Sequence, residues 1–214
     1  GYNESPVILC GNFGKISSYN YAGGISGASK DDIYGCFNKG SVTAKYTAGG
    51  VAGVAEANNL YKECYNSGNI SGEVSAGVIG FKNAGGGKIL RCYNIGEISS
   101  GIAILGGSKA GVSKLYQFAD CYALSTSESE VKILSIADFE NPDKLNFDFE
   151  NIWEYKNNGY SYPQLKYAED KNPSLSPVWG EEIVREYELI ETAQDFLNIK
   201  SNPSGTYRLT KDID

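Results

Sequence analysis

Five cysteines are the residues in this sequence with the most versatile chemistry. They lie at Cys10, Cys36, Cys64, Cys92 and Cys121, and subtraction of these positions gives intervals of 26, 28, 28 and 29 residues. A thiol can form a disulfide, bind zinc or act as a nucleophile. Zinc sites draw on closely spaced cysteine pairs, and no such pair occurs here. The wide and regular spacing instead indicates one structural position that is repeated five times.

The composition excludes several classes of active site. The chain contains no histidine, so Ser-His-Asp triads, Cys-His pairs and histidine-bound metals are all absent. Clustered acids, as in polysaccharide-degrading β-helix enzymes, are the remaining catalytic option. The acids between residues 10 and 122 do not recur in register and are expected at solvated corners: Asp31, Asp32, Glu56, Glu63, Glu73, Glu97 and Asp120. We therefore predict no catalytic residue and no enzyme activity, with such an enzyme as the least favoured alternative.

The charged residues give no sign of a cofactor, a metal or a polyanion. The pairs Glu128/Glu130 and Asp212/Asp214 lack the regular acidic spacing of a calcium loop. The net charge is -7, and Lys and Arg do not cluster as they do on surfaces that bind phosphate backbones. No run of about 18 to 20 apolar residues is present to span a bilayer. We predict no cofactor-binding residue, no metal ligand, no nucleic-acid partner and no membrane span.

The residues around the cysteines recur with them. Asn follows two positions after each of the first four cysteines, Gly four positions after and Ile or Val six positions after, and an apolar or aromatic residue lies three positions before every cysteine. These columns contain Asn12, Asn38, Asn66 and Asn94, then Gly14, Gly40, Gly68 and Gly96, then Ile16, Val42, Ile70 and Ile98. A Gly-rich block recurs about half a period later, at residues 22–27, 48–53 and 76–80. Such regularity indicates a repeat array.

Each repeat consists of short β-forming runs separated by Asn and Gly, and one copy alone cannot bury its apolar face. Stacked coils can do so, because their strands pair in parallel about 4.8 Å apart. We predict an all-β fold, a parallel β-helix (β-solenoid) of about 26–29 residues per coil, with a small C-terminal cap containing short helices. The Cys and Ile/Val columns should form interior ladders, the Asn column a stacked amide ladder, and the Gly column positive-φ corners. Free buried thiols are favoured over disulfides between neighbouring coils, which would strain the S–S torsion.

An aromatic column follows the cysteines directly, with Phe37, Tyr65, Tyr93 and Tyr122. Strand alternation places these rings on the side opposite the thiols. If the column faces outward, it forms a flat strip on which sugars can stack; if it lies at a bend, it belongs to the core. The sequence leaves both arrangements open.

The charge composition of the chain changes near residue 122. Residues 10–122 carry 10 Lys and Arg against 7 Asp and Glu, whereas residues 123–214 carry 9 against 18. Ser135 with Asp138 resembles a capping box for a short helix, and Thr192 with Asp195 predicts a helix to about Lys200, followed by a strand over residues 206–209. We predict solenoid repeats at 1–130, a capping segment at 131–168, a linker at 169–189 and the start of a further module at 190–214.

The repeat resembles a known family. Residues 64–70 (CYNSGNI) followed by residues 76–80 (AGVIG) are similar to the GLUG repeats of bacterial surface proteins, and the similarity covers about residues 8–122. The stretch from Trp153 to Tyr167 resembles segments that end such arrays. Residues 190–214 resemble lead-ins to further repeats, including those in non-catalytic regions of immunoglobulin-A1 proteases. The zinc-binding His motif of those proteases has no counterpart here.

The resemblance implies a non-catalytic repeat region of a secreted or cell-wall-associated bacterial protein. We expect an extracellular, cell-surface location and a role as a structural stalk or scaffold and as an adhesin, next to neighbouring domains of a larger chain. A module that binds carbohydrate or a host protein is the alternative, with a host glycan or an extracellular protein as its partner. The ligand, the parent protein and the oligomeric state are not determined by the sequence.

Overall fold

The computed structural model describes residues 1–56, 58–100, 102–107, 116–156 and 159–167, together with 188–190, 192, 194, 197 and 207–209. The chain divides into two units. The first comprises Gly1–Phe147 and Tyr155–Gln164, and the second comprises Asp148–Glu154 and Leu165–Asp214. The repeats all lie in the first unit.

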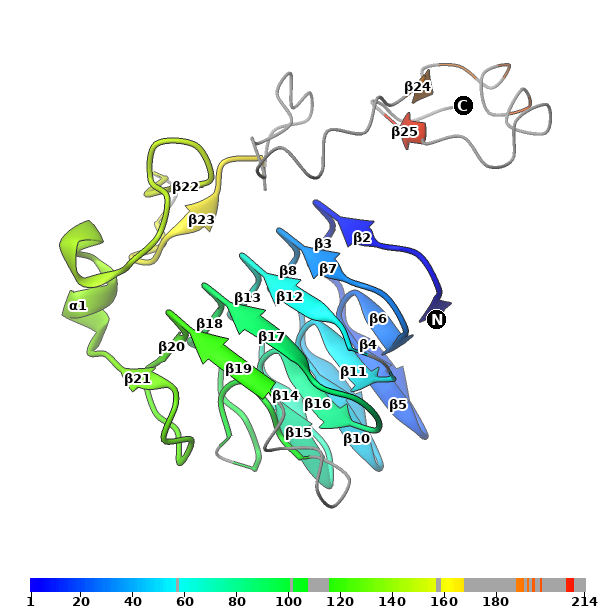
Figure 1. Cartoon of the computed structure of the whole chain (residues 1–214), viewed down its shortest axis with the longest axis horizontal. Coiled ribbons are helices and arrows are strands. Elements are labelled where there is room, and N and C mark those ends of the chain that lie inside the picture. The colour runs from blue at the N-terminus through cyan, green and yellow to red at the C-terminus, as the bar shows by residue number, and fades with distance from the viewer. Residues whose placement is uncertain are drawn as a thin grey trace. The chain divides into compact units, whose positions relative to one another are not determined.

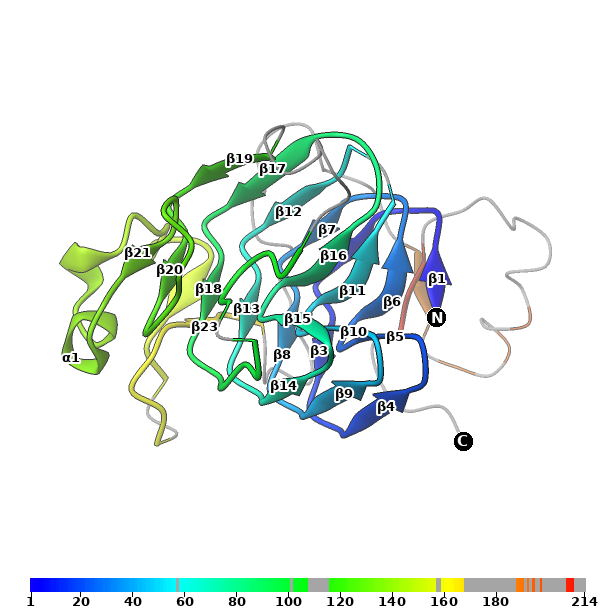
Figure 2. The same ribbon diagram turned by 90° about the horizontal axis from the view of Figure 1, so that it is seen from below.

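The first unit is an all-β solenoid of about four turns, built from parallel sheets (Figures 1 and 2). One sheet contains β1 (Tyr2–Asn3), β6 (Ser26–Ser29), β11 (Ala52–Ala55) and β16 (Ile79–Lys82), and a second contains β5 (Tyr21–Gly23), β10 (Thr47–Gly49) and β15 (Val74–Ala76). A third contains β2 (Val7–Ile8), β7 (Ile33–Tyr34), β12 (Leu60–Lys62), β17 (Gly87–Leu90) and β19 (Tyr116–Ala119). A fourth contains β3 (Gly11–Asn12), β8 (Phe37–Asn38), β13 (Tyr65–Asn66), β18 (Tyr93–Asn94), β20 (Tyr122–Ala123) and β21 (Lys132–Ile133), and a fifth contains β4 (Ile16–Ser18), β9 (Val42–Ala44) and β14 (Ile70–Ser71). The predicted fold class is confirmed.

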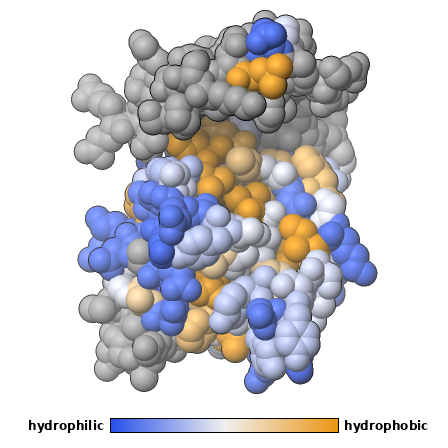
Figure 3. Space-filling view, turned by 90° about the vertical axis from the view of Figure 1, so that its right-hand side faces the viewer, coloured by the Kyte–Doolittle hydropathy of each residue, from blue (hydrophilic) through white to orange (hydrophobic). Residues whose placement is uncertain are grey.

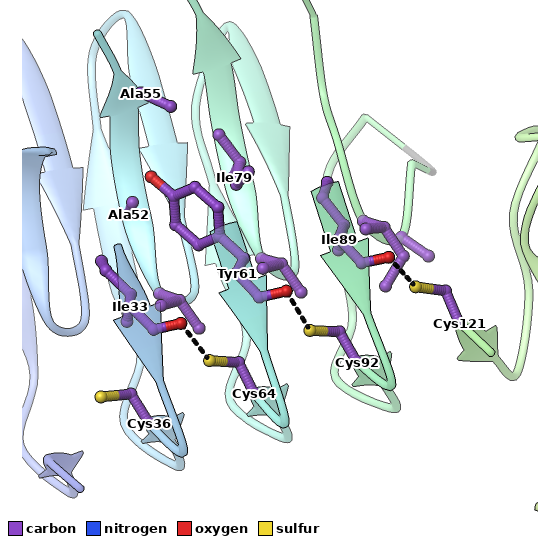
Figure 4. Packing of buried hydrophobic residues seen from close by; sticks show 14 of the residues in the cluster. Ile33, Cys36, Ala52, Ala55, Tyr61, Cys64, Ile79, Ile89, Cys92 and Cys121 are labelled. Atoms are coloured by element: carbon purple, nitrogen blue, oxygen red, sulfur yellow. Dashed lines mark hydrogen bonds between the residues drawn. The ribbon is translucent and has the colours of Figure 1, made fainter. Parts of the chain in front are cut away.

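The cysteines form the predicted interior ladder. Cys36, Cys64, Cys92 and Cys121 are buried within one apolar cluster, whereas Cys10 in the first coil is exposed, and all five thiols are free. Figure 4 shows thiols that donate to carbonyl oxygens of the preceding coil, from Cys64 to Ile33 over 3.6 Å, from Cys92 to Tyr61 over 3.7 Å and from Cys121 to Ile89 over 3.3 Å. The thiols therefore act as small apolar side chains with weak donors.

The asparagines form the predicted amide ladder. Nδ2 of Asn12 donates to Oδ1 of Asn38, Asn38 donates likewise to Asn66, and Asn66 to Asn94, each over 2.7 Å. Each of these amides also donates to a carbonyl oxygen two residues ahead, at Gly14, Gly40, Gly68 and Gly96. Because the interior amides are bonded on both sides, they are buried without loss of hydrogen bonds.

The glycines four positions after the cysteines do not have positive φ, so that prediction is wrong. A Cβ on Gly40 would lie 2.0 Å from the carbonyl oxygen of Gly14, and one on Gly68 would lie 2.0 Å from that of Gly40. Glycine is therefore needed because adjacent coils approach closely at this corner. Positive φ occurs instead immediately before each cysteine, at Leu9, Gly35, Glu63, Arg91 and Asp120, with values from 50° to 57°.

The first unit ends its coils with short helices, as predicted for the cap. α1 (Ile136–Phe139) begins with the predicted capping box of Ser135 and Asp138, and η2 (Pro142–Lys144) is a single 3₁₀ turn. No helix in the described part of the chain has the length and apolar character needed to cross a bilayer.

The second unit contains β22 (Trp153–Glu154), β24 (Glu188–Ile190), β25 (Tyr207–Leu209) and Leu165 of β23 (Gln164–Leu165). β24 and β25 pair in parallel, and β25 falls within the strand expected at residues 206–209. Most of the predicted linker and most of the helix expected after Thr192 lie outside the described residues.

Substitution of Gly68 by Ala should destabilise the solenoid, because the added methyl group would overlap the Gly40 carbonyl. We expect a loss of about 1–3 kcal/mol in the free energy of unfolding, measured by urea titration. Gly14→Ala is the matched control, since a Cβ on Gly14 would have its nearest neighbour at 3.7 Å, on Asn12. Equal losses for both variants would contradict the close-approach explanation.

Candidate binding surface

The aromatic column lies on the side of the strands opposite the thiols but is not exposed. Phe37, Tyr65, Tyr93 and Tyr122 all have exposed fractions of 4% or less. The rings of Phe37 and Tyr65 stack with centroids 5.2 Å apart, and those of Tyr65 and Tyr93 stack at 5.0 Å. The column is therefore continuous along the axis, as its position in the repeat predicts.

Segments after the repeats cover this column. Phe139 lies 5.4 Å from the ring of Tyr93 and Phe147 lies 5.3 Å from that of Tyr122, while Tyr162 meets Tyr65 edge-on at 6.2 Å. We call Phe139, Phe147 and residues 155–156 and 159–164 the aromatic cover. The sugar-stacking strip that the sequence left open is thus occupied by the chain itself.

Polar contacts fix the aromatic cover in place. The hydroxyl of Tyr93 donates to the carbonyl oxygen of Pro163, and Tyr155 donates to that of Phe139 over 2.7 Å. Burial raises the pKa of Tyr93 well above its ordinary value. The hydroxyl therefore remains protonated and able to donate at neutral pH.

Lys39 links one end of the column to the cover. Its ammonium donates to Oε1 of Gln164 over 2.8 Å and lies 4.5 Å from the ring centroid of Tyr160. The same ammonium is 5.7 Å from the ring centroid of Phe37 and 5.6 Å from that of Phe13. Cation–π attraction of this kind holds a charge over an otherwise apolar surface.

The acids of the repeats serve mainly as hydrogen-bond acceptors within the chain. Asp32 accepts from the backbone N–H of Leu60 over 2.7 Å and from the hydroxyl of Tyr34 over 2.5 Å. Glu63 is fully buried, so the expectation of a solvated corner is wrong for this residue, and its carboxylate forms an ion pair with Arg91. Both carboxylates therefore have partners within the chain that explain their presence through structure rather than catalysis.

A second expectation about the acids is wrong, because two of them do recur in register. Glu63 and Asp120 both occupy the positive-φ position before a cysteine, with Arg91 in the coil between them. The pattern is hidden in the sequence because this position also holds Leu9 and Gly35. Its backbone conformation is set by the flanking strands rather than by residue type.

Glu128 has a different role from the one considered for a calcium site. Its two carboxylate oxygens accept from the backbone N–H groups of Ile104 and Leu105, over 2.7 and 2.8 Å. Thr126 donates to the same carboxylate over 2.9 Å. Burial is the main cause that raises the pKa of Glu128. Asp212 and Asp214 lie outside the described residues.

The interior thiols are poorly suited to nucleophilic chemistry. Burial raises the pKa of Cys36 and Cys92 well above the ordinary value and that of Cys121 to about 12. The thiolate is the reactive form of cysteine, so these residues stay inert at neutral pH. Cys10 differs, because its interaction with Cys36 lowers its pKa to about 7. Within the described residues, His, Cys, Asp and Glu nowhere gather in a group of three that could hold a metal ion.

A groove of about 670 Å³ lies over β9 and β14 and the coil that follows them. Its polar lining comes from three successive coils: Ser41 and Thr43, then Asn69 and Ser71, then Glu97 and Ser99. Ile95 and Leu124 add apolar surface. Of these six polar positions the sequence pattern drew attention only to Glu97, as an acid expected at a solvated corner, because the residue type at both positions varies between the coils.

The interior thiols should make stability sensitive to alkaline pH. The pKa of a buried thiol is higher in the folded state than in the unfolded state, where it is near 9. The thiol therefore contributes its full share to the free energy of unfolding below pH 9, and this share is lost as the pH rises above 9. The advantage of the wild type over Cys92→Val in the free energy of unfolding should therefore fall by up to about 1.4 kcal/mol per pH unit above pH 9. Urea titrations at several pH values measure this difference.

The wild type is compared with a variant because Lys82 changes the stability with pH in the opposite direction to the thiols. Burial lowers the pKa of Lys82 to about 8, so its contribution to stability increases between pH 8 and 10.5. Cys10→Val is the control, since the lowered pKa of Cys10 predicts no further change above pH 9. A pH-independent difference for Cys92→Val would show that this thiol ionises freely in the folded state.

Removal of Tyr162 should uncover the aromatic column. Tyr162→Ala loses edge contacts with Tyr65 and Tyr93 and a 3.3 Å hydrogen bond to Ser67. We expect a loss of about 1–3 kcal/mol in stability together with increased binding of a hydrophobic dye. Tyr21→Ala, at a side chain that is 51% exposed, should change neither quantity appreciably. Unchanged dye binding in Tyr162→Ala would mean that the cover stays closed without this ring.

Comparison with known proteins identifies no relative of this chain. No protein-family model, no curated protein and no solved structure gives a significant match.

Proposed function

We propose that this chain is a non-catalytic, GLUG-like repeat region of a secreted or cell-wall-associated bacterial protein, and that it acts as a structural stalk or scaffold. The observation that carries this proposal is the unbroken asparagine ladder, in which three successive 2.7 Å amide bonds join four coils. These bonds run along the solenoid in addition to the backbone hydrogen bonds between strands. Such a body resists bending and keeps a fixed length, which are the properties a spacer needs.

The placement of the reactive side chains supports a non-catalytic role. The interior thiols are protonated, Glu63 is paired with Arg91, and Glu128 binds two backbone N–H groups. A glycoside hydrolase instead needs two carboxyl groups that flank one bond of a bound sugar. Release of reducing ends from pectin by the purified chain would contradict this part of the proposal.

A module that binds a glycan or a host protein remains the second candidate. The aromatic column cannot serve as its platform while the aromatic cover is closed. The groove over β9 and β14 is the feature that favours this candidate, because it combines exposed hydroxyl groups with apolar surface. Stalk and adhesin roles are compatible, since a rigid repeat can also present a binding surface.

Surface labelling tests the proposed location and role together. Antibodies against the purified chain should label intact cells of the bacterium that makes it. Removal of one complete coil, residues 37–64, joins Cys36 to Tyr65 and preserves the register of every ladder. A stalk should tolerate this deletion with undiminished labelling, because it shortens the solenoid by only about 4.8 Å.

A half-coil deletion, residues 37–50, is the matched control. It places unlike positions above one another and should abolish surface labelling through misfolding. Labelling that appears only after permeabilisation of wild-type cells would contradict the surface location. Loss of labelling with the whole-coil deletion would contradict a simple spacer role.

A further inference from the structure

The outer face of the sheet formed by β4, β9 and β14 carries a regular column of hydroxyl groups. Strand register aligns Ser17 with Thr43 and Thr43 with Ser71, and the bridge between Ile70 and Ile98 places Ser99 next in line. Thr43, Ser71 and Ser99 are exposed, whereas the intervening Val42 and Ile70 are buried in the interior. The hydroxyls therefore recur along the axis at the spacing of the coils, about 4.8 Å.

A second polar column runs beside the first. Ser41, Asn69 and Glu97 precede the buried Ile/Val position by one residue, so they also face outward. Both columns line the groove from β9 onward, with Ser17 of β4 outside it, and Figure 2 shows β4, β9 and β14 side by side along one edge of the solenoid. A ligand lying along the axis would meet the same pair of positions in each successive coil.

The chemistry of the lining favours an uncharged polyhydroxyl ligand. It offers hydroxyls and the amides of Asn69 and Asn94, groups that can both donate and accept, but no Lys or Arg. A phosphate or sulfate polymer would find no countercharge and would meet the carboxylate of Glu97. The apolar surface of Ile95 and Leu124 suits the C–H faces of sugar rings. The volume of about 670 Å³ is in the range of small-ligand sites.

One member of the column is already engaged within the chain. The hydroxyl of Ser99 lies 3.0 Å from that of Ser75 and donates to the carbonyl oxygen of Gly72 over 3.3 Å. The amide N–H of Gly72 in turn donates to Ser99. Thr43 and Ser71 are therefore the hydroxyls that we assign to a ligand, with Asn69 between them.

We propose that this groove binds a neutral, linear polysaccharide in an extended conformation along the solenoid axis. The hydroxyls of Thr43 and Ser71 recur at the spacing of the coils, which matches a polymer of identical units better than a single small molecule or a peptide of varied side chains. This inference goes beyond a stalk role and does not depend on it.

Affinity electrophoresis and calorimetry with defined polysaccharides test the proposal. The probes are neutral linear glycans (cello- and chito-oligosaccharides, xylan and laminarin), with heparin and polygalacturonate as charged comparators. At least one neutral glycan should bind, and the charged polymers should not. Binding of the charged polymers alone, or no binding of any neutral glycan, would overturn the proposal.

Two substitutions in the same hydroxyl column locate the site. Ser71→Trp fills the groove and should weaken binding at least about tenfold, whereas Ser17→Trp, in the same column but outside the groove, should leave it unchanged. Circular dichroism checks that both variants fold. If Ser71→Trp does not fold, the smaller change Thr43→Ala combined with Ser71→Ala should still weaken binding. Equal affinity of the groove variants and wild type would place the glycan elsewhere and refute the assignment.

Discussion

The close stacking of one coil on the next constrains every position in this solenoid. Strands of neighbouring coils are held about 4.8 Å apart, so each side chain has its own counterpart in the adjacent coil as a neighbour. Asparagine suits one column because its amide can donate to the next amide and to a carbonyl oxygen at the same time. Glycine is required at another because the carbonyl oxygen of the neighbouring coil occupies the place of a Cβ. The repeat is thus a consequence of contacts between coils rather than of local preferences within one coil.

Positions that form identical contacts in every coil were readable from the sequence. Cysteine and asparagine recur because burial and amide pairing select one residue type, so both ladders were predicted correctly. The glycine column was recognised, but its cause was not, since close approach and positive φ both favour glycine. The actual positive-φ column holds Leu9, Gly35, Glu63, Arg91 and Asp120. No single residue type marks it, and the register of Glu63 with Asp120 was missed for that reason.

The aromatic column and the groove depend on information that periodicity does not carry. Periodicity places Tyr65 on the side opposite the thiols, but the position of Tyr162 in the aromatic cover decides whether the ring is exposed. The groove arises where exposed side chains vary from coil to coil. Ser41 and Asn69 share a position without sharing a residue type. Surface sites on a repeat protein are therefore the hardest to predict from its sequence, because contacts between coils do not restrict the residue types at exposed positions.

Figure 3 shows hydrophobic residues gathered near the middle of one face, with hydrophilic residues beside and below them. The apolar residues of the first coil, such as Val7 and Ile25, are only partly buried. After the last turns, by contrast, Glu128 occupies two backbone N–H groups with its carboxylate. Those donors would otherwise be open to a strand from a second molecule, which is how β-rich proteins grow into fibres. Any incoming strand would first have to displace this partly buried, hydrogen-bonded carboxylate, so a single side chain protects these donors against end-to-end polymerisation.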